Sequence, residues 1–354
     1  MLTQVVAGRV YDYSHCVGRS AAGGGMGFAN PQSAALGADG VLYVVSRGSE
    51  TISGVGWNRT GTGARVSKCT IGTEAGEEEY LGEFSKYGDG EGDFVWGSGI
   101  ATDSRGNVYI TDEWLDRITV FDKDGGFLAN WNVLDGTEGE PYGASGLAMD
   151  SDENLYVVGG RMHQVRKFNK QGRLLTSWGS YGAGDGQFDS PWGITVDHQG
   201  HVYVADHRNH RVQKFSADGE WMAQFGGATG TGKLYYPTGV AVDPEGDVYV
   251  SDWSDNGMQP GRVHIFSPDG RFITSLIGDA QELSKWAMMT VDANVDLIKA
   301  RRRVRSTEPE WRFSMPTGVF FDGGNGRLMV MDTQRGRLQI YNKLKDYMEP
   351  QFNL

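Results

Sequence analysis

Residues 190–215 read SPWGITVDHQGHVYVADHRNHRVQKF, and four other parts of the chain resemble this stretch. These parts are Gly99–Asp112, Gly146–Val158, Gly239–Asp252 and Gly318–Asp332. The glycines that open successive copies, at positions 99, 146, 193 and 239, lie 47, 47 and 46 residues apart. A period of about 40–50 residues is typical of repeats that each form one four-stranded blade of a β-propeller. The repeat therefore predicts an all-β propeller.

The copy that begins at Ser190 shows the strands of a single blade. Gly193–Asp197 alternates as an inner strand, and Val202–Ala205 follows after a tight turn. Arg211–Phe215 is the predicted third strand, and Glu220–Phe225 is the predicted outer strand after a short hairpin turn. Each repeat is thus expected to form an antiparallel sheet of four strands.

Six second strands can be counted along the chain, which predicts six blades in one domain over residues 1–354. The last blade has only three strands of its own, ending at Gln339–Lys343. The missing outer strand is expected at the N-terminus, because Gly8–Tyr13 resembles the outer strand Gly172–Trp178. The N-terminal strand should therefore close the ring and leave no free sheet edge there.

Two insertions interrupt the period, at about 48–64 and at about 279–312. The second contains apolar residues at helical spacing between Leu283 and Ile298, which predicts one or two short helices between blades five and six. Both insertions belong to the face that carries the blade connections and the loops between second and third strands, here called the mouth face. We therefore expect a lidded pocket at the mouth of the central channel.

Composition narrows the possible partners and compartments. The formal net charge of -12 opposes contact with a phosphate backbone, so nucleic acid is not an expected partner. No apolar run approaches the roughly 20 residues that span a bilayer, and the first residues do not resemble a secretory signal. Cys16 and Cys69 are too few for a disulfide framework. A soluble, cytoplasmic protein without membrane contact is the expectation.

The run Ser190–Asp197, followed by Asp206–Val212, resembles the NHL repeat, and similar repeats extend from Gly8 to Lys343. NHL propellers serve as RNA-binding domains, protein-interaction platforms, extracellular sensor domains and lyases. The resemblance therefore implies a six-bladed propeller and leaves the function open.

One enzyme with a distantly similar propeller is the peptidyl-hydroxyglycine amidating lyase. Ser46–Gly48 resembles the place where that family carries a pocket arginine. The positions that match its zinc-binding histidines are Ser98, Trp192 and Thr317, and none of them supplies an imidazole ligand. The resemblance thus implies that this zinc site is absent, whereas Arg47 remains a candidate anchor for an anion.

Positions around the channel that differ between blades are the candidates for function, because the repeat does not require them. The predicted ligand-binding residues are Arg47, Trp114, Arg161, Trp192, Arg208 and Trp253. Glu113 and His207 are the predicted catalytic residues, since either could move a proton. This mixture suits a small anionic or aromatic ligand, with lyase or hydrolase activity as the chemistry to test. The alternative is a set of solvated side chains around a wide pore.

Four of the predicted second strands end in an aspartate: Asp112, Asp206, Asp252 and Asp332. A ring of carboxylates could hold a hard cation. Recurrence in successive blades instead favours a structural role, in which each carboxylate accepts backbone N–H bonds in its own blade. Arginines that recur before the third strands are likewise expected to bond within their blades.

A divalent metal ion is the only cofactor that the sequence suggests. His15, His163 and His207 are the candidate ligands, and all three are expected in loops of the mouth face. They come from different blades, so convergence on one ion depends on side-chain reach that the sequence does not establish.

A second functional hypothesis is a protein-interaction platform without catalysis. Propellers present broad faces, and Trp114 and Trp253 could provide exposed aromatic anchors for a protein partner. The expected partner is therefore either a small molecule or another protein.

Overall fold

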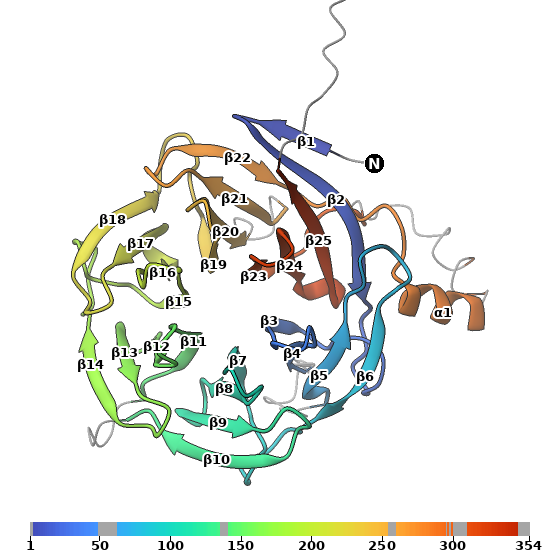
Figure 1. Cartoon of the computed structure of the whole chain (residues 1–354), viewed down its shortest axis with the longest axis horizontal. Coiled ribbons are helices and arrows are strands. Elements are labelled where there is room, and N and C mark those ends of the chain that lie inside the picture. Colours follow the sequence, from blue (N-terminus) through green and yellow to red (C-terminus); the bar gives the residue numbers. More distant parts are fainter. Residues whose placement is uncertain are drawn as a thin grey trace, which may run out of the picture.

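The computed structural model describes residues 3–48, 62–134, 141–253, 260–294, 296, 299 and 310–345. Six antiparallel sheets stand around a central axis, as Figure 1 shows. Five sheets contain four strands, and the sixth contains five. The predicted six-bladed propeller is confirmed.

The strands of the blades follow the chain in order. Blade one contains β3 (Pro31–Leu36), β4 (Leu42–Arg47), β5 (Ala64–Thr70) and β6 (Glu79–Phe84). Blade two contains β7 (Gly97–Thr102), β8 (Val108–Asp112), β9 (Arg117–Phe121) and β10 (Phe127–Asn132). Blade three contains β11 (Ala144–Met149), β12 (Leu155–Gly159), β13 (Gln164–Phe168) and β14 (Leu174–Trp178). Blade four contains β15 (Pro191–Val196), β16 (Val202–Asp206), β17 (Arg211–Phe215) and β18 (Trp221–Gly226). Blade five contains β19 (Tyr236–Val242), β20 (Val248–Trp253), β21 (Arg262–Phe266) and β22 (Phe272–Leu276).

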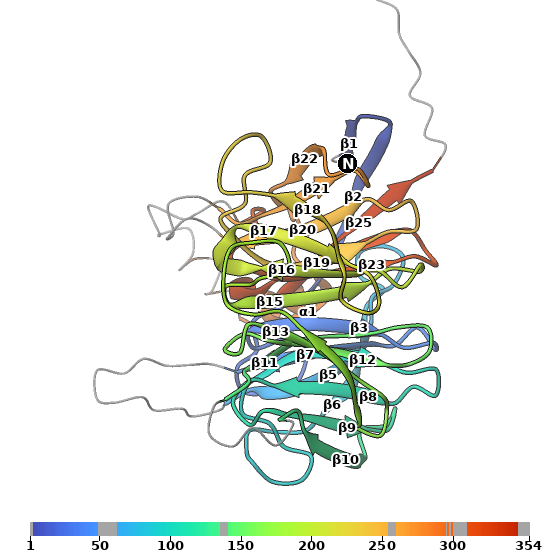
Figure 2. The same cartoon turned by 90° about the vertical axis from the view of Figure 1, so that its left-hand side faces the viewer.

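Blade six joins the two ends of the chain. It contains β23 (Pro316–Asp322), β24 (Arg327–Asp332) and β25 (Arg337–Leu344), and β25 pairs antiparallel with β2 (Arg9–Gly18). The predicted closure by the N-terminal strand is therefore confirmed, although β2 is longer than expected. A further strand, β1 (Thr3–Val6), pairs with β2 and was not predicted. Figure 2 shows β1 close to β22, and the Gln4 side chain donates a 2.6 Å hydrogen bond to Thr274 of β22.

A buried ion cluster reinforces the closure between blades five and six. Arg9 Nη2 lies 2.6 Å from Asp247 Oδ1, and Lys343 Nζ lies 2.9 Å from Asp247 Oδ2. Lys343 also contacts Asp243, and both carboxylates are almost fully buried. Burial by itself would raise the pKa of Asp247, but hydrogen bonds from Arg9 and Lys343 outweigh it and lower the pKa. One cation from each end of the chain thus binds the same blade.

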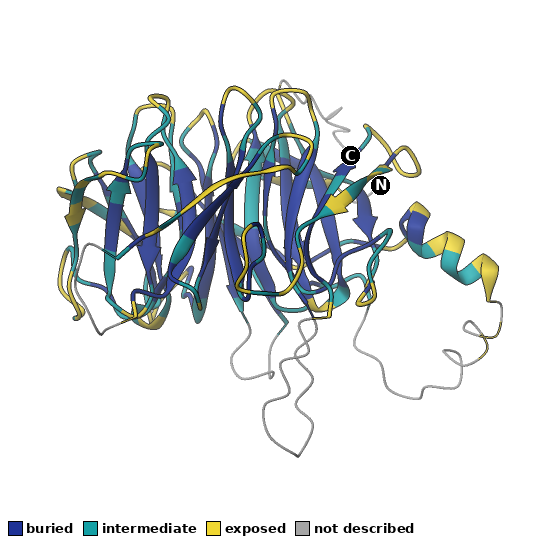
Figure 3. Cartoon of the chain, turned by 90° about the horizontal axis from the view of Figure 1, so that it is seen from below, coloured by how far each residue is buried: buried dark blue, intermediate teal, exposed yellow. Residues whose placement is uncertain are grey.

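Apolar contacts fill the spaces between neighbouring blades. At the closure, Val17 and Phe28 near the N-terminus pack with Leu42 of blade one and with Met329 and Ile340 of blade six. Figure 3 shows the buried strands in dark blue and the exposed loops of both faces in yellow. Each blade therefore depends on its two neighbours for a buried surface.

The recurring aspartates hold the connections between blades. Asp112 Oδ2 accepts a 2.6 Å hydrogen bond from the backbone N–H of Val95, 17 residues earlier. Asp206 binds the N–H of Asp189 at 2.8 Å, again 17 residues earlier. Asp252 and Asp332 accept equivalent bonds from Tyr235 and Ser314 at 2.9 and 2.7 Å. All four aspartates are fully buried, and the structural interpretation of this ring is confirmed.

In the two blades that lack this aspartate, a different side chain accepts the hydrogen bond from the corresponding N–H group of the blade connection. In blade one, Ser46 Oγ accepts a 3.3 Å bond from the N–H of Ala29. In blade three, where Gly159 occupies the position, Asp116 of blade two accepts bonds from Tyr142 and Gly143 at 3.1 and 2.6 Å. The blade connection is therefore held by a buried side-chain oxygen in every blade.

The recurring arginines also act within their blades. Arg211 Nε donates to Asp206 at 2.9 Å, and Arg337 Nε donates to Asp332 at 2.8 Å. Arg117 donates to three carbonyl oxygens of the preceding blade connection, at Asp89, Gly90 and Asp93. The predicted structural role of these three arginines is confirmed.

The helical insertion lies away from the channel. The helix α1 (Lys285–Ala293) confirms the prediction of a short helix between blades five and six. Figure 1 shows α1 outside the ring, beside β2 and β6. Trp286 anchors the helix there, because its ring packs between those of Phe28 and Tyr80. The expectation that this helix would cover the channel mouth is wrong. Residues 49–61 and 300–309 of the two insertions lie outside the described residues.

Cys16 and Cys69 are free, buried thiols, which agrees with the expectation that the chain has no disulfide framework. Within the described ranges, no helix is both long enough and apolar enough to cross a membrane.

Removal of residues 1–18 should abolish cooperative folding. This deletion removes Val10, Tyr11 and Val17, which are each at most 4% exposed. Burial of each such side chain contributes about 1.5–3 kcal/mol, so the loss is comparable to a typical total stability of about 5–15 kcal/mol. Removal of residues 1–7, which takes away only β1, should cost about 1 kcal/mol or less. Thermal unfolding monitored by circular dichroism compares the two; a cooperative transition in the longer deletion would contradict the closure argument.

Asp112→Ala should lower the free energy of unfolding by about 3 kcal/mol, because four backbone N–H groups lose their buried acceptor. Asp124→Ala is the matched control, since the Asp124 side chain is 78% exposed and should change stability by less than about 0.5 kcal/mol. Urea unfolding measures both variants. Equal stabilities would show that Asp112 does not hold the blade connection.

Candidate functional site

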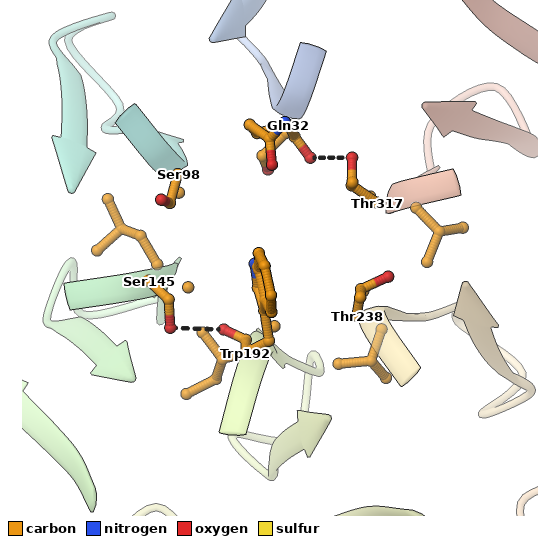
Figure 4. A pocket seen from close by; sticks show the side chains of 16 residues that line it. Gln32, Ser98, Ser145, Trp192, Thr238 and Thr317 are labelled. Atoms are coloured by element: carbon orange, nitrogen blue, oxygen red, sulfur yellow. Dashed lines mark hydrogen bonds between the residues drawn. The ribbon is translucent and has the colours of Figure 1, made fainter. Parts of the chain in front are cut away.

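The central channel narrows to a waist, which is formed by residues near the start of each inner strand. Six side chains, one from each blade, surround it: Gln32, Ser98, Ser145, Trp192, Thr238 and Thr317. Figure 4 shows the Trp192 ring pointing into the centre, so the cavity there has a volume of only about 50 Å³. Such a space holds no more than a water molecule or two. Towards the opposite face, the channel widens to a cavity of about 280 Å³, whose described lining includes Phe320 and Phe321 and no charged side chain.

Three waist hydroxyls connect neighbouring blades. Ser145 donates to the backbone carbonyl of Trp192 at 3.1 Å, and Thr317 donates to that of Gln32 at 3.0 Å, both drawn in Figure 4. Thr238 donates to the carbonyl of Pro316 at 3.1 Å. These bonds occupy the hydroxyl protons, so these three side chains are primarily structural.

Arg47, at the end of β4, lies above the waist in a fixed position. Its Nη2 donates to Ser98 Oγ and to Glu113 Oε2, both at 2.6 Å. The side chains of Arg47 and Glu113 are 13% and 22% exposed, so this ion pair is partly shielded from solvent. The guanidinium carbon lies 5.4 Å from the Trp96 ring centre and 5.8 Å from that of Trp192. A cation held between two aromatic rings in this way is stabilised by cation–π attraction.

Two groups of rings from three blades stand around the mouth, and together we call them the aromatic arc. Its members are Trp96, Trp114, Trp192, His207, Tyr236 and Trp253. The ring centres of Trp192 lie 5.2 Å from Trp253 and 5.4 Å from His207. Trp96 and Trp114 are 5.5 Å apart, and Arg47 connects this pair to Trp192. The arc therefore gives the mouth flat apolar surfaces with one cation between them.

His207 begins the short 3₁₀ helix η1 (His207–Asn209) that follows β16. Its Nδ1 lies 3.2 Å from the carbonyl oxygen of Pro237, which can only accept, so Nδ1 carries the proton and Nε2 is the acceptor. Burial lowers the pKa of His207 to about 4, and this effect exceeds the opposing hydrogen bond to Pro237. The imidazole is therefore neutral at pH 7.

The other predicted ligand-binding residues lie at the rim. Trp114 is 43% exposed, and the Arg161 guanidinium carbon lies 6.0 Å from its ring centre. Arg161 and Arg208 are exposed, and Arg208 is part of η1. The structure thus gathers Arg47, Glu113, Trp192, His207 and Trp253 at the mouth. Trp114, Arg161 and Arg208 extend this set outwards.

The three histidines proposed as metal ligands do not converge. His15 lies within strand β2 on the outside of the ring, so its placement in a mouth-face loop was wrong. His163 packs against Tyr181 and accepts a bond from the N–H of Ser190, whereas His207 packs against Trp192. Across the part of the chain that the structure describes, no three His, Cys, Asp or Glu side chains are placed to hold a metal ion.

Two members of the aromatic arc were missed by the sequence analysis. Trp96 and Tyr236 each stand two residues before a waist residue, Ser98 and Thr238. The matching positions in the other blades hold Asn30, Gly143, Ser190 and Met315, so this position also varies between blades. The variation between blades that identified the other candidates could therefore also have identified Trp96 and Tyr236.

Comparisons with known proteins agree with the fold. A model of the NHL repeat matches residues 188–215, and a model of a β-propeller repeat matches residues 220–256. No curated protein matches the chain in sequence.

Solved structures with the same fold include lyases. A streptogramin B lyase is 12% identical with a TM-score of 0.55, over 94% of this chain and 98% of that one. A catalytically inactive virginiamycin B lyase from Staphylococcus aureus, solved with quinupristin, is 13% identical with a TM-score of 0.51, over 89% and 95%. A Bacteroides thetaiotaomicron protein of unknown function is 16% identical with a TM-score of 0.59, over 95% and 76%.

At these identities the likeness to solved structures establishes the fold alone. The repeats in the sequence, the six sheets and the match over 188–215, which covers the first three strands of blade four, lead to one conclusion. The chain is a six-bladed β-propeller, and its fourth blade matches the NHL repeat.

Proposed function

We propose that this protein binds a small, flat molecule with an anionic or carbonyl group at the mouth of the channel. The observation that carries the proposal is the position of Arg47 between the rings of Trp96 and Trp192. Planar apolar walls around one fixed cation suit an aromatic body with a negatively charged or hydrogen-bond-accepting group. Trp192 forms the floor of this site, because it narrows the channel beneath the mouth.

Two buried donors near the mouth support this proposal. Arg47 Nε and Trp253 Nε1 are both buried, and neither has a hydrogen-bond partner among the described residues. A buried N–H group without an acceptor costs about 1–3 kcal/mol. A carboxylate or carbonyl oxygen of a ligand could accept a hydrogen bond from either donor after a small movement of these side chains. Such a bond would recover part of that energy.

The mouth is better suited to binding than to proton transfer. A general base is most effective when its pKa lies near the working pH, and the pKa of His207 is about 4. Glu113 is engaged by Arg47 at 2.6 Å. We therefore assign His207 Nε2 as a hydrogen-bond acceptor for the ligand and Glu113 as the group that positions Arg47.

The alternative of a protein-interaction platform has less support from the same geometry. That hypothesis needed Trp114 and Trp253 as exposed anchors. Trp114 is 43% exposed, but Trp253 packs against Trp192 and His207 inside the mouth. An anchor that faces the channel favours a small ligand over a flat protein surface.

Arg47→Ala and Trp192→Ala should each weaken binding of small aromatic acids about 5- to 30-fold, since each removes a contact worth about 1–2 kcal/mol. Titrations of intrinsic tryptophan fluorescence with indole-3-carboxylate, benzoate and naphthalene-2-sulfonate measure the dissociation constants. The corresponding uncharged amides should bind less tightly than the acids.

The matched control is Arg173→Ala, which removes an exposed arginine from the turn before β14 and should leave binding unchanged. Saturable binding with the same dissociation constant in wild type, Arg47→Ala and Trp192→Ala would place the ligand elsewhere and refute the proposal.

The lowered pKa of His207 predicts a specific loss of stability in acid. The unfolded chain takes up a proton on this histidine near pH 6.5, whereas the folded protein resists protonation until about pH 4. Stability from this residue is therefore complete above pH 6.5 and declines as the pH falls towards 4. Between pH 7 and pH 4.5, wild type should lose about 2 kcal/mol more than His207→Gln. Urea unfolding at both pH values tests this; equal losses would mean that His207 titrates normally.

A further inference from the structure

A second cavity lies on the outer flank of the ring, away from the channel mouth. It is a groove of about 280 Å³, bounded by β2 at Tyr13–Cys16, by Ala75 and by the segment Asp279–Leu283 that leads into α1. Two contacts fix that segment: Ser284 Oγ donates to the Gly18 carbonyl at 2.5 Å, and the Lys285 N–H donates to Glu78 at 2.6 Å. Every residue that lines the groove is described by the structure. These two hydrogen bonds hold the wall that leads into α1 in place.

An irregularity in β2 shapes the floor of this groove. Tyr13 pairs with Tyr341 and His15 pairs with Ile340, so Ser14 is an extra residue without a partner on β25. Such a β-bulge breaks the alternation of side chains along a strand and redirects one of them. Here Ser14 Oγ lies 2.8 Å from Nδ1 of the next residue, His15.

The hydrogen bonds of His15 determine its tautomer. Nε2 lies 2.7 Å from the carbonyl oxygen of Ile71, which can only accept, so Nε2 carries the ring proton. Burial lowers the pKa of His15, which keeps the imidazole neutral, whereas the hydrogen bond to Ile71 and the charge of Glu78 oppose this shift and favour the proton that a general base must accept. Nδ1 is therefore a free acceptor, and the Ser14 hydroxyl donates its proton to it. The other acceptor near Ser14 Oγ is the Thr73 carbonyl, at 3.4 Å, which is a much weaker contact.

These contacts reproduce the arrangement of an activated nucleophile. A serine hydroxyl donates to a neutral imidazole, and a third group on the far nitrogen fixes the orientation of the imidazole. In this chain the third group is the Ile71 carbonyl in place of a carboxylate. Ser14 is partly exposed and lines the groove, whereas His15 is 2% exposed beneath it.

The neighbouring thiol does not compete for this role. Cys16 is 4% exposed, and its Sγ donates to the Glu282 carbonyl at 3.3 Å. Burial raises the pKa of the Cys16 thiol, so the reactive thiolate is disfavoured. Ser14 is thus the accessible nucleophile of the groove.

We propose that Ser14 and His15 form an active site separate from the channel mouth, in which Ser14 is the nucleophile and His15 the general base for hydrolysis of small carboxylic esters. Ser14 Oγ attacks the acyl carbon, its proton passes to His15 Nδ1, and the bond to the alcohol oxygen breaks. The departing oxygen takes that proton and leaves as the alcohol. A water molecule then attacks the acyl carbon and gives a proton to Nδ1, which returns it to Oγ as the carboxylic acid leaves.

The lining of the groove indicates which esters fit. Asp279 and Glu282 are part of the walls, and the described lining residues include no lysine or arginine. Neutral or cationic esters are therefore favoured over anionic ones, which is the reverse of the preference proposed for the channel mouth. The Tyr13 hydroxyl and the Gln281 amide are side-chain donors in the same lining and are candidates to stabilise the oxyanion.

The test uses the full chain and an uncharged alkyl fluorophosphonate, which reacts with activated serines. Intact-mass spectrometry should show one adduct per chain, and peptide mapping should locate it at Ser14. Ser14→Ala should abolish the adduct. His15→Gln should lower the labelling rate constant at least about 100-fold, because it removes the general base.

The matched control is Ser177→Ala, which removes a serine from β14, the outer strand of blade three, and should leave labelling unchanged. Circular dichroism establishes that each variant is folded. If His15→Gln does not fold, the comparison of Ser14→Ala with wild type decides alone. An adduct that persists in Ser14→Ala, or no adduct in wild type, would overturn the proposal.

Discussion

A buried side-chain oxygen at each blade connection is the constraint on which the rest of the structure depends. The connection must pass from the outer strand of one blade to the inner strand of the next, and its N–H groups cannot reach a sheet ladder. Asp112, Asp206, Asp252 and Asp332 accept those N–H groups, and Ser46 and Asp116 do so where the aspartate is missing. This bond sets where each inner strand begins, and therefore which side chains form the waist and which surround the mouth.

The repeat made the fold predictable because it encodes local geometry in every blade. The period, the strand alternation and the similarity between Gly8–Tyr13 and Gly172–Trp178 were sufficient to predict six blades and closure by the N-terminus. The strand β1 was not predicted because no other blade has a fifth strand. The position of α1 was also missed, since it depends on a pocket for Trp286 that Phe28 and Tyr80 create only in the folded ring.

The candidate site was predictable in part for the same reason. Variation between blades identified Arg47, Glu113, Trp192, His207 and Trp253, which the structure brings together. It could not show that Arg47 lies between two indole rings, because side-chain reach across the channel is set by six strands at once. The Ser14–His15 contact was hidden for a different reason. Neighbouring residues on a regular strand face opposite sides, and only the bulge in β2 lets the two side chains meet.

Trp192 also divides the channel into two compartments with different chemistry. The mouth above it is aromatic and contains the Arg47–Glu113 ion pair, whereas no charged side chain is among the described residues that line the cavity beneath it. The waist between them has only about 50 Å³ of space. A molecule larger than water that enters at the mouth must leave by the same opening. A molecule that binds over the mouth face after the ligand would therefore trap the ligand in the site. The order of the two binding steps would then determine how long the ligand stays bound.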